Sequence, residues 1–294
     1  MKKLILSLII LSIVFCAFAQ SSKESSAVNL AVMQGPTGFS SAMLPSYIKT
    51  SVYPSPNEAV AKLVNGELDF AVIPANTVAA LFNKGVKIRA VAIVGEGMLS
   101  VIGSDSEAKS IAVPGAGGTP DHMSTLLYPE LERNYSISAP AQLAQLVIAG
   151  KCTKAILPQP FVNMVLAKNS NVRILDDVQK RWKDKTGFAQ YPMSVLVVRD
   201  SLASANPKMV DSVKKDYAKS IGSVLSSVHE AAIIIEEAGI MKAEMAEGAI
   251  KDCAIVFKDG KKAESELKAY YEVLINLAPQ AIGGKLPENT LYAF

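Results

Sequence analysis

The sequence predicts an α/β protein built from two similar lobes, each a mixed sheet flanked by helices. Three observations lead to this prediction: helical and strand-like segments alternate, one pattern of Pro, Gly and apolar residues occurs twice, and a strand running into a Gly-rich turn also occurs twice. Alternating helices and strands imply crossover connections around a sheet. Two copies are too few for a solenoid of stacked repeats, so we expect two lobes.

The repeated pattern lies in "PNEAVAKLVNGELDFAVIPANT" and "PAQLAQLVIAGKCTKAILPQPF". Four anchor residues keep the same spacing in both stretches, with no gap and matching apolar residues between them. A generic helix–Gly–strand unit would share one or two of these positions, whereas four in one register favour an internal repeat. The anchor pairs, each 84 residues apart, are Pro56 and Pro140, Gly66 and Gly150, Ala71 and Ala155, and Pro74 and Pro158.

Each copy predicts a helix, a buried strand and a second helix. In the first copy, apolar residues spaced as on one helix face lie between Pro56 and Gly66, which suit a helix start and a helix end. The run "DFAVIP" is typical of a buried strand, and the helix after it ends at Gly85. In the second copy we expect a helix over residues 142–149, a strand over 154–157 and a helix over 161–167.

Two Gly-rich turns, "QGPTGFSSA" and "PGAGGTPDH", each follow a predicted strand and open a predicted helix. Such a turn leaves backbone N–H groups free, and a helix N-terminus carries partial positive charge, so an anion can bind there without Arg or Lys. In open α/β sheets, ligands bind at the carboxyl ends of strands, where these turns lie. Gly and Pro also make tight turns for purely structural reasons; the occurrence of this turn in both lobes favours ligand binding.

A further predicted strand, "YPMSVLVVRD", follows the second copy and precedes a long helical tail. We therefore expect one lobe from residues 26–104 and 191–294, and a second lobe from residues 105–190. The two crossings between the lobes, at residues 103–105 and 190–192, predict a hinge.

The N-terminal stretch "MKKLILSLIILSIVFCAFAQSS" is typical of a secretory signal peptide. Lys2 and Lys3 precede an apolar run that is shorter than the roughly 20 residues of a membrane span, and a small-x-small cleavage pattern ends it. We therefore expect a signal peptide over residues 1–19 and an exported protein that is periplasmic or on the cell surface. A lipid anchor through Cys16 is the alternative, which Phe15 disfavours because a small residue usually precedes a lipidated Cys.

Composition and motifs exclude several classes of function. The formal net charge of +3 over 294 residues gives no indication of nucleic-acid binding. His122 and His229 have no neighbouring Cys or second His, and there is no G-x-S-x-G, P-loop or dinucleotide motif. Cys152 and Cys253 fall in different lobes and are expected to be free thiols. We therefore expect no catalytic residue, metal or cofactor, and a monomer.

Four stretches resemble the solute-binding proteins of ABC importers, in the broad nitrate/sulfonate/taurine and thiamine-precursor group. They are "NGELDFAVIPANTVAALFNKG", "IAVPGAGGTPD", "AGKCTKAILPQPF" and the ending "AIGGKLPENTLYAF". The resemblance extends over residues 28–294. It implies the type II periplasmic-binding-protein fold with a two-crossover hinge, closure of the lobes on a small solute, and delivery of that solute to an ABC permease in the membrane.

The resemblance also implies which residues contact the solute. In this group the contacts come from the first strand–helix turn, the loop after the "DFAVIP" strand, the Gly-rich turn of the second lobe, and the loop after its matching strand; Tyr191 at the return crossing is a weaker candidate. In this chain those residues are Gln34, Gly35, Pro36, Thr37, Gly38, Asn76, Thr77, Gly117, Gly118, Thr119, Gln159, Pro160 and Tyr191.

The residue types at these positions bear on the solute. Members that hold cationic pyrimidines or thiamine-like rings use acidic and aromatic side chains, whereas these turns offer amides, hydroxyls and backbone N–H groups. We therefore expect a small anionic or neutral organic solute with a sulfonate or carboxylate group. One alternative is a binding protein for a vitamin precursor of the thiamine-pyrimidine or riboflavin type. Another is an enzyme of pyrimidine-precursor synthesis, which would need His and Cys-rich metal chemistry absent from this sequence.

Overall fold

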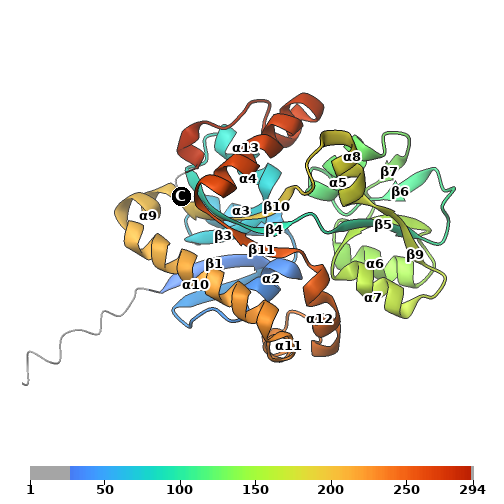
Figure 1. Cartoon of the computed structure of the whole chain (residues 1–294), viewed down its shortest axis with the longest axis horizontal. Helices are drawn as coiled ribbons and strands as arrows, with labels where there is room; N and C mark the ends of the chain where they lie inside the picture. The colour runs from blue at the N-terminus through green and yellow to red at the C-terminus, as the bar shows by residue number, and fades with distance from the viewer. Residues whose placement is uncertain (1–26, 293–294) are drawn as a thin grey trace, which may run out of the picture.

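The computed structural model describes residues 27–292, which form two α/β lobes side by side (Figure 1). The expected signal peptide and Cys16 lie outside the described residues. The first lobe opens with β1 (Val28–Met33), α2 (Pro36–Ser40), β2 (Ile48–Tyr53), α3 (Pro56–Val64), β3 (Phe70–Pro74), α4 (Ala75–Asn83) and β4 (Ile88–Glu96). The second lobe contains β5 (Leu99–Gly103), β6 (Ser110–Ala112), α5 (Thr119–Leu127), β7 (Glu132–Asn134), α6 (Pro140–Ile148), β8 (Lys154–Pro158), α7 (Phe161–Lys168), β9 (Arg173–Asp177) and α8 (Val178–Thr186).

The chain then returns to the first lobe and completes it. The returning elements are β10 (Pro192–Arg199), α9 (Asp200–Ala205), α10 (Pro207–Ser226), α11 (Val228–Glu237), α12 (Ala243–Ala249), the 3₁₀ turn η1 (Ile250–Asp252), β11 (Ile255–Lys258), α13 (Gly260–Leu277), η2 (Pro279–Ile282) and η3 (Asn289–Leu291). No helix among residues 27–292 has the length and apolar character needed to cross a membrane.

The two sheets confirm the internal repeat. The first sheet has the order β11-β4-β10-β3-β1-β2 and the second has the order β9-β5-β8-β6-β7. In the first sheet β3 pairs parallel with β1 and antiparallel with β10; in the second β8 pairs parallel with β6 and antiparallel with β5. β3 and β8, which carry the two copies of the repeated pattern, therefore occupy equivalent places in two mixed sheets, as the predicted fold class requires.

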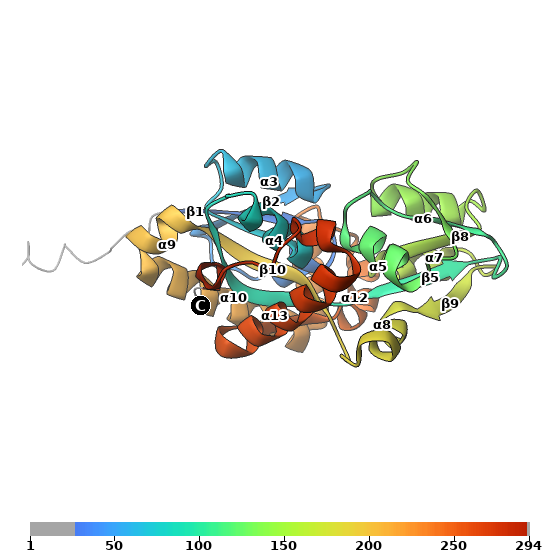
Figure 2. The same ribbon diagram turned by 90° about the horizontal axis from the view of Figure 1, so that it is seen from above.

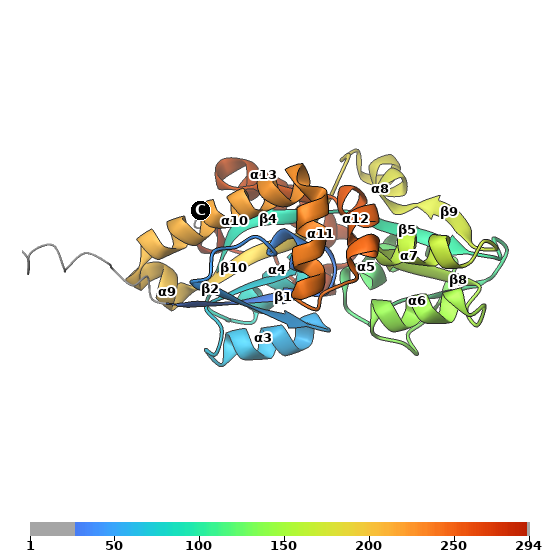
Figure 3. The same cartoon turned by 90° about the horizontal axis from the view of Figure 1, so that it is seen from below.

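Alternating side chains of the central strands pack helices on both faces of each sheet. Phe70 and Val72 of β3 face a core shared with α10 and α11, while Ala71 and Ile73 face a core shared with α3, α4 and α13. Figure 2 shows α13 across one face of the first sheet, and Figure 3 shows α10 and α11 across the other. In the second lobe, α6 and α7 cover one face, and α5 and α8 cover the other.

The first crossing between lobes lies earlier than the sequence predicts. β4 belongs to the first sheet and β5 to the second, so the chain changes lobe at Gly97 and Met98. Gly103, where the crossing was expected, pairs with β8 and β9 inside the second sheet. The prediction of a hinge at residues 103–105 and of a lobe boundary at residue 104 is therefore wrong, because only Gly97 and Met98 separate β4 from β5 and no long loop marks the change of sheet.

The two crossings lie next to each other. The Gly97 N–H donates to the Tyr191 carbonyl oxygen at 3.0 Å, at the return crossing that precedes β10. A Cβ on Gly97 would come within 2.5 Å of the Tyr191 ring, so only Gly lets the two crossings approach this closely. Cys152 and Cys253 are free thiols, as predicted.

Candidate functional site

Four turns at the carboxyl ends of strands meet where the lobes touch. Two of them follow β1 and β3 in the first lobe, and two follow β6 and β8 in the second. A Cβ built on Gly35, after β1, would lie 3.2 Å from Cδ of Pro160, which follows β8. Asn76, after β3, hydrogen-bonds to the Gly-rich turn after β6. The structure thus brings together candidate residues that lie far apart in the sequence.

Asn76 bridges the two lobes with both ends of its amide. Its Nδ2 donates to the carbonyl oxygen of Gly117 at 3.3 Å, and its Oδ1 accepts from the Thr119 hydroxyl at 3.2 Å. Asn76 and Thr119 are 2% and 3% exposed, so these bonds form away from bulk water. Asn76 makes no capping bond to α4, whose start is held by the Tyr271 hydroxyl donating to the Ala75 carbonyl at 2.8 Å. Its amide is therefore committed to the second lobe.

Asp121 fixes the shape of the Gly-rich turn in the second lobe. Its Oδ2 accepts from the Gly117 N–H at 2.7 Å, and its Oδ1 accepts from the Tyr135 hydroxyl at 2.7 Å. Gly117 has a φ of 79°, a left-handed conformation that favours glycine, whereas Gly118 has a φ of −85°. The Asp121 carboxylate therefore accepts the Gly117 N–H of this turn, and it makes no bond to the N–H groups of Gly118 and Thr119 at the start of α5.

His122 lies one turn into α5, half-buried beside the same turn. Burial lowers the pKa of His122, and the neighbouring Asp121 carboxylate and the Gly117 backbone oppose this effect. The imidazole is therefore biased toward its neutral form at neutral pH.

The first turn is held mainly by its own contacts. The Thr37 hydroxyl accepts from the Met33 N–H at 2.8 Å and donates to the Met33 carbonyl oxygen at 3.1 Å, which ties α2 to the end of β1. A Cβ on Gly38 would come within 2.9 Å of that carbonyl oxygen, so Gly38 serves close packing. Gln34 is exposed at the turn, and Gly35 is buried against the second lobe. Solute contact by the residues of this turn stays a prediction. The Thr37 hydroxyl already bonds to the Met33 N–H and carbonyl oxygen.

Gln159 and Tyr191 differ in what surrounds them. The Gln159 amide bonds to Asn163 of α7, and Asn163 in turn reaches the first lobe. Tyr191 is fully buried, with its ring against Trp182 and Tyr270 and its hydroxyl 3.2 Å from Oε1 of Gln179. The structure gives Tyr191 a role in the core of the hinge, which does not support the predicted solute contact.

Three helix N-termini begin at the contact between the lobes. They belong to α4, α5 and α7, of nine, nine and eight residues. The first turns of α4 and α7 contain no acidic residue, so their partial positive charge is not offset there. Among residues 27–292, no three His, Cys, Asp or Glu side chains are grouped so that they could hold a metal ion.

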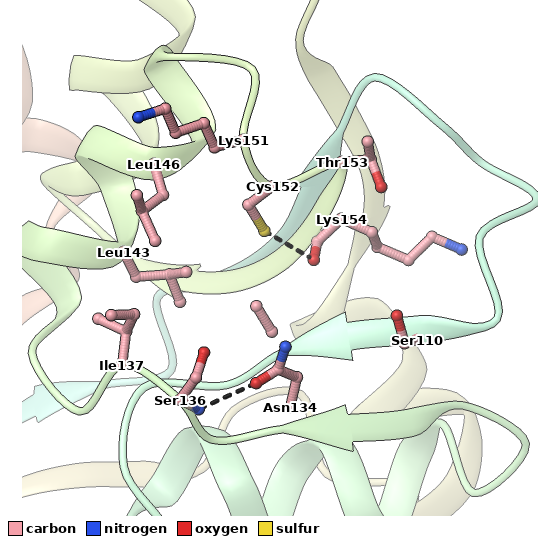
Figure 4. A pocket seen from close by; sticks show the side chains of 11 residues that line it. Ser110, Asn134, Ser136, Ile137, Leu143, Leu146, Lys151, Cys152, Thr153 and Lys154 are labelled. Carbon is pink, nitrogen blue, oxygen red and sulfur yellow. Dashed lines mark hydrogen bonds between the residues drawn. The ribbon is translucent and has the colours of Figure 1, made fainter.

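Two surface hollows lie elsewhere. One of about 210 Å³ in the second lobe is lined by residues that include Asn134, Leu143 and Cys152 (Figure 4). The other, of about 540 Å³, is lined by residues of the first lobe that include Leu63 and Arg199. The hollow of the first lobe borders the start of β4, and the hollow of the second lobe borders the start of β8 together with the ends of β6 and β7.

The family model described as menaquinone biosynthesis, VitK2_biosynth, matches residues 41–274, which is most of the chain. The chain belongs to the menaquinone-biosynthesis family. The matched span contains the second turn of the first lobe and both turns of the second lobe, and it begins after the first turn. No curated protein matches the sequence.

Solved structures similar to this member of the menaquinone-biosynthesis family include an ABC transporter protein and two sulfonate-binding proteins. An ABC transporter protein from Parabacteroides distasonis has 23% identity and a TM-score of 0.78, over 92% of this chain and 99% of that chain. The aliphatic sulphonate binding protein SsuA from Escherichia coli has 12% identity and a TM-score of 0.66, over 89% and 91%. The alkanesulfonate-binding protein SsuA from Xanthomonas axonopodis pv. citri, bound to MOPS, has 13% identity and a TM-score of 0.67, over 92% and 98%. These similarities confirm the periplasmic-binding-protein fold.

Proposed function

We propose that this protein is an extracytoplasmic solute-binding protein of an ABC importer. It captures a small anionic or neutral organic solute between its two lobes and delivers it to a membrane permease. One observation carries the proposal: turns at the carboxyl ends of four strands, two from each lobe, meet across the lobe boundary, with Asn76 bonded to Gly117 and Thr119. A site shared between two lobes is one that lobe closure can complete.

The charges around these turns favour a solute with a sulfonate or carboxylate group. The N-termini of α4 and α7 carry partial positive charge without an acidic residue in their first turns. The Asp121 carboxylate is turned toward the Gly117 N–H and the Tyr135 hydroxyl, which offset its charge. The sulfonate-binding proteins with the same fold support this class of solute. They also support an exported location, which agrees with the predicted signal peptide.

A second candidate is an enzyme, or a carrier of an aromatic vitamin precursor, connected with menaquinone synthesis. The observation that favours it is the family match over residues 41–274. The half-buried His122 and the adjacent Asp121, which bonds to Gly117, are a titratable pair beside the Gly-rich turn that such an enzyme would use. We favour binding without turnover because the residues that bridge the lobes are an amide, a hydroxyl and a backbone carbonyl, which hold a solute and do not activate one.

The two candidates differ in what happens to the bound molecule. Small molecules released from freshly purified protein are identified by mass spectrometry and then incubated with the protein again. The proposal predicts that an alkanesulfonate, a carboxylate or a related neutral compound is recovered unchanged. Conversion of the compound at a rate that depends on His122 or Asp121 would instead establish the enzyme.

A further inference from the structure

A second contact joins the lobes beside the turn after β8, between α7 and the segment of the first lobe that contains α12 and η1. Asn163 of α7 donates from Nδ2 to Oδ2 of Asp252 at 2.8 Å and to the carbonyl oxygen of Gly248 at 3.3 Å. Close in sequence to these acceptors, Met241 and Met245 of the first lobe pack against the core that α6 and α7 form in the second lobe. The first lobe thus reaches the second lobe through both polar and apolar contacts here.

The Asp252 carboxylate decides which way the Asn163 amide faces. A carboxylate only accepts hydrogen bonds, so the amide nitrogen must face Asp252 and the amide oxygen must face the other way. The Asn163 side-chain oxygen accepts from Nε2 of Gln159 at 2.9 Å. Oε1 of Gln159 accepts from the backbone N–H of Asn163 at 3.3 Å. Gln159 is therefore held at both ends of its amide: its oxygen by a backbone N–H of its own lobe, and its nitrogen by a side-chain oxygen whose direction a carboxylate of the opposite lobe sets.

We propose that Asp252 and Asn163 are a positioning pair that couples lobe closure to the orientation of Gln159, a candidate solute contact. The inference rests on the proposed function. When the lobes separate, Asp252 leaves Asn163, and the Asn163 amide is free to turn over. Gln159 then keeps its bond to the Asn163 backbone N–H but loses the fixed acceptor of its Nε2. Only the closed arrangement holds both ends of the Gln159 amide, which favours solutes that match the donor and acceptor held in this way.

The test uses the mature chain with one label on each lobe, and a short alkanesulfonate and a short carboxylate as probes. Asp252→Ala should raise the fraction of open lobes and weaken binding of the probe roughly twofold to tenfold, since one exposed hydrogen bond to a charged group is lost. The NMR signals of the Gln159 side-chain NH₂ group should shift and broaden, because Nε2 loses its fixed acceptor. Asp211→Ala is the matched control, because this exposed aspartate on α10 of the same lobe has a single ionic partner, Lys214, at 3.8 Å.

Exchanging the two groups provides a stricter variant. Asn163→Asp alone places two carboxylates together and should open the lobes further. Adding Asp252→Asn restores an N–H···O bond across the lobes and leaves an acceptor for Nε2 of Gln159, so the double variant should recover closure. An unchanged lobe distance and unchanged Gln159 signals in folded Asp252→Ala would overturn the inference. Both readouts work without a solute, so failure of the probes to bind counts against the proposed function alone.

Discussion

Asn76 is a predicted site residue that the structure places in contact with both lobes. The sequence marks it only as a polar residue after a buried strand, where it could equally cap the next helix. In the structure it makes no cap, and both ends of its amide bond to the second lobe. Because the Gly117 carbonyl only accepts and the Thr119 hydroxyl can donate to the amide oxygen, the orientation of the amide is determined.

Replacement of Asn76 by Ala should weaken solute binding. The substitution leaves the Gly117 carbonyl and the Thr119 hydroxyl without their buried partner across the lobes, which costs the closed form about 1–3 kcal/mol, or roughly fivefold to 150-fold in Kd. Titration calorimetry with the identified solute measures this change, and Asn65→Ala, at an exposed amide at the end of α3, is the control. Equal affinities of Asn76→Ala and the unaltered protein would show that Asn76 has no part in the site.

His122 should make the protein less stable in acid. Its folded-state pKa lies below the unfolded value of 6.5, so the unfolded chain binds more protons between these two values. The contribution of the neutral His122 to the free energy of unfolding is complete above pH 6.5, and it is lost as the pH falls toward the folded-state pKa. Urea unfolding at pH 7.5 and pH 5 should therefore show a smaller loss of stability for His122→Asn than for the unaltered protein. An identical loss in both would mean that burial does not affect this imidazole.

At the scale of elements, the turn before α5 depends on two neighbouring glycines with different backbones. Gly117 has a positive φ and is bonded to Asp121, while Gly118 has an extended backbone and space for a side chain, with its nearest neighbour at 3.6 Å. The sequence "PGAGGTPDH" shows that the turn is Gly-rich but not which glycine the fold needs.

Substitution of the two glycines should separate folding from binding. Gly117→Ala should lower the free energy of unfolding by about 1–2 kcal/mol, because an L-residue is strained in the left-handed region. Gly118→Ala should leave stability within experimental error, and the bulkier Gly118→Val should still fold while it blocks the approach of a solute to the backbone. Denaturant unfolding and solute titration check both expectations. Equal destabilisation by the two Ala substitutions would contradict the assigned backbone.

The helices and strands were largely predictable, and the first place where the chain changes sheet was not. β3 and β8 could be predicted because a short apolar run closed by Pro is a local signal, and their equivalence follows from the spacing of the repeat. The first crossing was misplaced because only the short segment "GEG" separates two apolar runs there, and Gly97 is distinguished by its contact with the distant Tyr191. The bond between Asn163 and Asp252 joins residues 89 apart, which no local pattern reveals.

At the scale of the whole molecule, the lobes are connected by two adjacent crossings and touch through separate contacts. The crossings at Gly97 and Tyr191 are joined by a hydrogen bond, and the aromatic rings of Trp182, Tyr191 and Tyr270 form a core that both lobes share. Because the backbone changes lobe only at these crossings, rotation there is the motion that can part the four turns without unfolding either sheet.

The most direct test of the account is the distance between the two lobes in solution, measured with and without the identified solute. The account predicts that the solute shortens this distance and raises the melting temperature by mass action, and that Gly118→Val removes both effects while the protein stays folded. Tight binding of the solute with an unchanged distance between the lobes would contradict the account, because the site would then lie within one lobe.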